Sequence, residues 1–163
     1  MSDALNDPFE ESRWGSLRYP NVAKDLIDRS MKVMVGLAKC FAVESHSSPH
    51  LAFEAGGEMP SIGKFTTPLA VADVRLSFRF QTAHEAGEPD DIVSTIQVFV
   101  QDAEANSGWR KVNWFVEVPQ YGAEIAHCGG QHRNLSDSLG GGRLNMNRYQ
   151  SGMALYRAIV ESK

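Results

Sequence analysis

The feature that most constrains this chain is a switch in the spacing of its apolar residues. Between residues 21 and 43 they recur every three or four positions, which is the period of one face of an α-helix. From residue 51 to residue 118 they alternate with polar residues instead, as they do in half-buried antiparallel strands. A chain with this order is expected to pack a long N-terminal helix against a sheet.

The clearest strand spans residues 74–82, and one of its faces carries only apolar residues. These are Val74, Leu76, Phe78 and Phe80. We predict that this face is buried against helix 21–43, because a shift of one residue would expose the whole set. The same reasoning predicts burial of a second set, on the next two strands: Ile96, Val98, Val100, Val112, Trp114 and Val116.

Five strands are expected, joined by short polar turns, and a further short one fits residues 123–127. The five cover residues 51–55, 62–66, 74–82, 92–101 and 109–118. A C-terminal helix is expected to begin near Asn147, with the apolar stripe Tyr149, Met153, Tyr156, Ile159 and Val160. Strands that follow one another with short connections are typical of a meander. The predicted fold class is therefore α+β, an antiparallel meander sheet of about five strands packed against two helices.

The chain's 163 residues are enough for one domain. Asp7 and Pro8 favour the start of a short helix, which Gly15 and Pro20 should end, so residues 1–19 are predicted to form an N-terminal arm.

The net charge of −4 argues against nucleic acid as a partner, since that affinity comes mainly from basic residues. No apolar run is long enough to cross a membrane, and residues 1–12 do not resemble a signal peptide. Two cysteines are too few for a disulfide scaffold. We therefore expect a cytoplasmic protein that works without a cofactor.

Residues 127–133 contain the densest group of reactive side chains. Cys128 is a candidate nucleophile with His132 as its base, and His127 and Arg133 are candidate ligand contacts. The alternative is a polar loop with a half-buried cysteine. We predict no metal site, because the paired Cys and His spacings of zinc sites are absent; Pro49 separates His46 from His50, and His84 lacks a second histidine four residues on.

Three glycines at residues 140–142 precede Arg143 and the expected helix start, where backbone N–H groups can hold an anion. Residues 122–143 contain six glycines within the only net-positive stretch of the chain. We predict a mobile segment that an anionic small ligand or an acidic protein partner would order through Arg143 and Arg133. A flexible hinge is the alternative.

The polar face of the predicted sheet is a further candidate site. Arg75 and Arg79 would line a groove for a ligand or partner there, or simply form the wet side of the sheet. Phe99 and Phe115 share this face, and covering them predicts self-association as a homodimer.

No catalytic constellation is complete. We therefore favour a non-catalytic binding module for a small ligand or protein partner, using the sheet face or the pocket between sheet and helices. The alternative is a small enzyme, a hydrolase or isomerase, with its site in residues 122–143.

Overall fold

The computed structural model of this chain describes residues 8–41, 51–82, 90–136 and 141–161. These residues form two helices and seven strands. The elements are α1 (Pro8–Lys39), β1 (Ala52–Ala55), β2 (Ser61–Thr66), β3 (Val71–Gln81), β4 (Asp91–Gln101), β5 (Trp109–Pro119), β6 (Ile125–Cys128), β7 (Gln131–Asn134) and α2 (Gly141–Glu161).

All seven strands form one sheet in chain order, and each neighbouring pair is antiparallel. The predicted α+β fold and meander are thus confirmed, with seven strands in place of about five. The additional pair, β6 and β7, is a hairpin of two four-residue strands that turns at Gly129 and Gly130. Both glycines have positive φ angles, 59° and 90°, which suit a tight two-residue turn.

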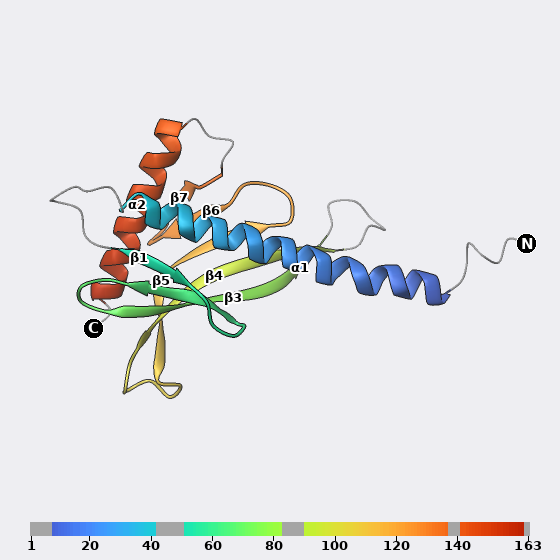
Figure 1. Cartoon of the computed structure of the whole chain (residues 1–163), viewed down its shortest axis with the longest axis horizontal. Coiled ribbons are helices and arrows are strands. Elements are labelled where there is room, and N and C mark those ends of the chain that lie inside the picture. The colour runs from blue at the N-terminus through green and yellow to red at the C-terminus, as the bar shows by residue number, and fades with distance from the viewer. Residues whose placement is uncertain (1–7, 42–50, 83–89, 137–140, 162–163) are drawn as a thin grey trace, which may run out of the picture.

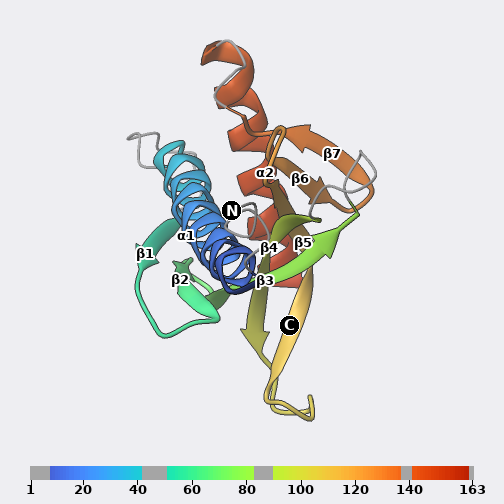
Figure 2. The ribbon, with the colours of Figure 1, turned by 90° about the vertical axis from the view of Figure 1, so that its right-hand side faces the viewer.

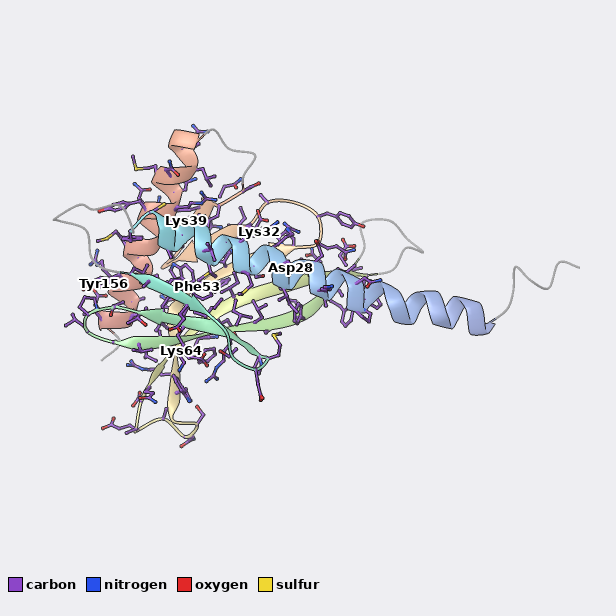
Figure 3. All side chains as sticks on the ribbon, viewed as in Figure 1. Asp28, Lys32, Lys39, Phe53, Lys64 and Tyr156 are labelled. Atoms are coloured by element: carbon purple, nitrogen blue, oxygen red, sulfur yellow. The ribbon has the colours of Figure 1, made fainter. Side chains whose placement is uncertain are left out.

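Both helices lie on one face of the sheet (Figures 1 and 2). Helix α1 contacts β1, β4 and β5, and α2 contacts β5, β6 and β7. Asp28, Lys32 and Lys39 lie on the exposed side of α1, away from the sheet (Figure 3). The core between the layers contains most of the residues predicted for it: Val74, Leu76, Ile96, Val98, Val100, Val112, Trp114 and Val116.

The predicted burial of Phe78 and Phe80 was wrong, because their side chains are 40% and 64% exposed. Strand β3 is longer than its neighbour β2, whose pairing with it ends at Arg75. Beyond that point no described strand lies beside β3 on this side. The Tyr19 ring packs against Phe80 in a T-shaped arrangement, with 5.2 Å between ring centroids, and still leaves Phe80 largely exposed.

The predicted break between a short first helix and a long second one was also wrong. Helix α1 runs without interruption from Pro8 to Lys39 and contains Pro20. Proline removes one backbone hydrogen bond, but packing around it can offset that loss. Tyr19 supplies such packing through Phe80, and its hydroxyl donates to the Asp90 carbonyl at 3.3 Å. The N-terminal part of α1 extends past the sheet (Figure 1).

Arg29 of α1 fastens the connection between β5 and β6 to the helix layer. Its guanidinium donates to Glu124 at 2.8 and 3.1 Å, to the Pro119 carbonyl at 2.6 Å and to the Gly122 carbonyl at 3.2 Å. One side chain thereby holds both ends of this connection.

Helix α2 begins at Gly141, six residues before the predicted start. Gly141, Gly142 and Arg143 therefore lie in its first turn and do not precede it. Within the described residues, neither helix is both long and apolar enough to cross a membrane.

Candidate functional site

A large cavity lies where the sheet meets the C-terminal half of α2. Its volume is about 640 Å³. Its walls come from the start of β5, the end of β6 with the following turn, and α2. The lining residues are Arg110, Lys111, Val112, Asn113, Cys128, Gly129, Ala154, Arg157, Ala158 and Glu161.

Small residues create this cavity. Ala154 and Ala158 are one helical turn apart on α2, and Gly129 faces them from the turn after β6. Side chains of leucine size at these positions would fill much of the space. A cavity of this volume is within the range that holds small ligands, roughly 300–1,000 Å³.

The rim of the cavity is basic in a chain whose net charge is negative. It has three basic side chains, Arg110, Lys111 and Arg157, and one acidic side chain, Glu161. Arg110 pairs with Asp102 at 3.2 Å and Arg157 with Glu161 at 3.4 Å. Both arginines are largely exposed, and such pairs contribute little energy, so an anionic ligand can replace them cheaply.

Cys128 lines this cavity, but its thiol is not activated. Burial raises the pKa of the Cys128 thiol, and the nearby Ser151 hydroxyl and Arg133 guanidinium offset this only in part. A higher pKa leaves less thiolate at neutral pH, and the thiolate is the nucleophilic form.

His132 does not reach Cys128. In the β6–β7 hairpin, His132 pairs with His127 while Cys128 pairs with Gln131. Adjacent strand residues point to opposite faces. Cys128 therefore faces α2, whereas both histidines lie on the outer face of the sheet, away from the helices. The structure brings the two histidines together and separates them from the cysteine.

The two histidines belong to a polar cluster on that outer face. Glu117 accepts from Arg79 at 2.9 Å and contacts Nε2 of His127 at 3.0 Å. The His127 ring stacks on Phe115, with centroids 4.4 Å apart, and His132 packs against His127 at 4.3 Å. The cluster borders a cavity of about 250 Å³. Across the described residues, no three metal-binding side chains are grouped closely enough to hold an ion.

Arg75 is the centre of a second outer-face cluster. Its Nε donates to Asp73 at 2.7 Å, and its guanidinium lies 4.4 Å from the Phe99 ring centroid and 5.1 Å from that of Trp109. Phe99 is thus covered by Arg75, as Phe115 is by His127. Neither ring needs a second copy of the chain to cover it.

The remaining candidates, Arg133 and Arg143, lie on different elements. Arg133 is on the helix-facing side of β7, where it bonds Gln150 and also reaches Gln131 at 2.7 Å. Arg143 is exposed in the first turn of α2. His46, His50 and His84 lie outside the described residues.

Sequence reasoning missed most of the cavity at α2. One signal was available: Ala154 and Ala158 share a helix face four residues apart, and Arg157 lies between them. Larger residues such as Tyr149 dominate the apolar stripe of α2 and mask this signal.

Comparisons with protein-family models, with curated proteins and with solved structures found no match to this chain. Function is therefore inferred from the geometry of the chain itself.

Proposed function

We propose that this chain is a non-catalytic binding module whose ligand occupies the cavity between β5, β6 and α2. The observation that carries the proposal is the combination of a small-residue wall, at Ala154 and Ala158, with a basic rim. The wall leaves room for a ligand, and the rim favours an anionic small ligand or an acidic segment of a protein partner.

The outer face of the sheet is the weaker candidate for the binding site. Arg75 and Arg79, which were expected to line a groove there, are each paired with a carboxylate of the same face. The Arg75 pair is the more buried of the two, and its guanidinium also lies over the Phe99 and Trp109 rings, so a ligand would have to displace more contacts at Arg75 than at the exposed arginines of the cavity rim.

The enzyme alternative has less support. Cys128 and His132 lie on opposite faces of the hairpin, so the nucleophile lacks the base proposed for it. We also propose a cytoplasmic location, which two free cysteines suit. Self-association remains a prediction that light scattering at micromolar concentration would test.

Filling the cavity tests the proposed site. NMR would monitor the amide signals of the full chain while mixtures of small carboxylates and phosphate monoesters are added. We expect ligands to shift signals of residues 110–113, 128–129 and 154–161. The Ala158→Leu variant should abolish these shifts, whereas the control Ala55→Leu, on exposed strand β1, should retain them.

The absence of any ligand-dependent shift at these residues would contradict the proposal. So would ligands that still bind the folded Ala158→Leu variant with unchanged affinity.

A further inference from the structure

Strand β5 has an unpaired edge beside this cavity. It pairs with β4 on one side at both of its ends, over residues 109–111 and 115–119, and the register shifts between these two stretches. On the other side, β6 pairs only with residues 114–117. Over residues 110–113 the structure places no described strand next to this edge.

The edge of β5 is open over residues 110–113 because β6 ends before it reaches them. Cys128 is the last residue of β6 and pairs with Trp114, after which the turn at Gly129 and Gly130 leads into β7. The line that β6 would follow beside residues 110–113 is thus vacant in the described part of the chain. The hairpin of β4 and β5 extends past the neighbouring strands here (Figure 2).

The cavity occupies this vacant line. Val112 and Asn113 of the open edge form one wall, Ala154 and Ala158 of α2 form the other, and Gly129 closes the end. A strand edge with a helix beside it is suited to an extended peptide, which gains main-chain hydrogen bonds from the edge and side-chain contacts from the helix.

We propose that the ligand of this site is an acidic peptide segment that binds in an extended conformation as an added strand, antiparallel to β5 and in line with β6. This inference rests on the proposed function. Val112 faces the helices and is buried, whereas Lys111 points to the other side of the strand. Alternate side chains of the peptide therefore meet the small apolar wall and the basic rim, which favours alternating apolar and acidic residues.

The positive charge of the cavity rim favours acidic peptides over basic ones. Arg110, Lys111 and Arg157 attract carboxylates, and in the described residues Lys111 forms no ion pair that would compete. A basic peptide would meet like charges on both walls. Binding should therefore weaken as the salt concentration rises.

A displayed library of random dodecapeptides, panned against the full chain, supplies the probes. The enriched peptides are then synthesised and their binding is measured by calorimetry. We expect them to be acidic, with alternating apolar residues, and to shift NMR signals of residues 110–113 and 154–158. N-methylation of the set of alternate amides that faces β5 should weaken binding at least about tenfold, while methylation of the other set changes it little.

Charge reversal on the rim provides the matched comparison. The Lys111→Glu variant should weaken binding about tenfold. Lys64→Glu is the control, because Lys64 is exposed on β2, which is paired on both sides. It should change the affinity less than about twofold.

Three results would overturn the inference: no enriched peptide, peptides that map to another sheet edge, such as residues 77–81 or the outer strands β1 and β7, or binding that N-methylation does not affect. If small anions still bind the cavity and Ala158→Leu abolishes that binding, the proposed function survives and only the peptide assignment fails. If neither anions nor peptides bind, both fail.

Discussion

Gly152 of α2 packs closely against Leu37 of α1 and against Phe41, just past the end of α1, so replacing it with alanine should destabilise the fold. A Cβ atom built at this position would lie 2.2 Å from Cε2 and 2.6 Å from Cζ of Phe41, and 3.2 Å from Leu37. Normal contacts between carbon atoms are about 3.5–4.0 Å, so the first of these is more than about 1 Å too short. Phe41 cannot yield easily, since it is buried and its ring stacks on Tyr149 at 5.4 Å.

Two effects of opposite sign decide how much the Gly152→Ala substitution changes the free energy of unfolding. Alanine favours the helix over glycine by about 1 kcal/mol. Overpacking of a core costs about 1–3 kcal/mol, and here the short contacts involve two atoms of one ring, which places the cost near the upper end. The net loss of unfolding free energy should be about 1–2 kcal/mol.

Gly142 provides the control within the same helix. A Cβ atom there would meet nothing within 4 Å, so Gly142→Ala should gain up to about 1 kcal/mol from helix propensity alone. Urea unfolding, followed by circular dichroism, measures both variants. The double variant Gly152→Ala, Phe41→Leu should recover part of the loss, because the smaller side chain relieves the contact. If Gly152→Ala proved as stabilising as Gly142→Ala, the close approach of α2 to Phe41 would be refuted.

Other predictions concern single contacts. Arg29→Lys should lower the unfolding free energy by about 1–3 kcal/mol, because lysine keeps the charge but cannot reproduce the planar set of bonds to a carboxylate and two carbonyls; a loss below about 0.3 kcal/mol in urea unfolding would contradict this. Leu76→Ala should cost about 2–5 kcal/mol, and Phe78→Ala much less, since Leu76 is buried and Phe78 is partly exposed; the reverse order would contradict the position of β3. Burial raises the pKa of Cys128, so iodoacetamide should alkylate it more slowly in the folded than in the unfolded chain at pH 8. An equal alkylation rate in both states would contradict the raised pKa. Because the thiol loses its proton at lower pH in the unfolded chain than in the folded one, the contribution of Cys128 to stability should decline as pH rises through the thiol range.

The long strands could be predicted because each contains several repeats of the apolar–polar alternation. Strands β3, β4 and β5 have eleven residues each, enough for alternation to mark both faces. Strands β6 and β7 have four residues each, which is too few for the same signal, and only part of β6 was expected. Periodicity also reports only which way a side chain points. Phe78 points toward the helix face as predicted, yet it is exposed because β2 ends before reaching it.

The proposed binding site depends on such differences in strand length, and this is why sequence reasoning located only Cys128 of it. The cavity exists because β6 stops at Cys128 while β5 begins at Trp109, five residues before the first residue that β6 pairs. Neither end is marked by a motif that carries chemistry. Reactive side chains suggested a site at Cys128 and His132 instead, although their register places them on opposite faces.

The open edge of β5 can be tested without any ligand. Exposed strand edges tend to pair with other chains, and a lysine on the edge is a common protection against such pairing. Lys111 is in that position, so its charge would protect this edge as well as attract the proposed acidic peptide. Replacing it with valine should let two copies pair through residues 110–113, since valine favours strands and removes the repulsion.

We expect Lys111→Val to associate with rising concentration in light scattering. Lys64→Val should not, because β2 has a strand on either side. Ala158→Leu combined with Lys111→Val should reduce the association, because the larger side chain occupies the space that the incoming strand needs. If Lys111→Val instead behaved like Lys64→Val up to high micromolar concentration, the edge would not be open to a partner, and the peptide site inferred from it would lose its structural basis.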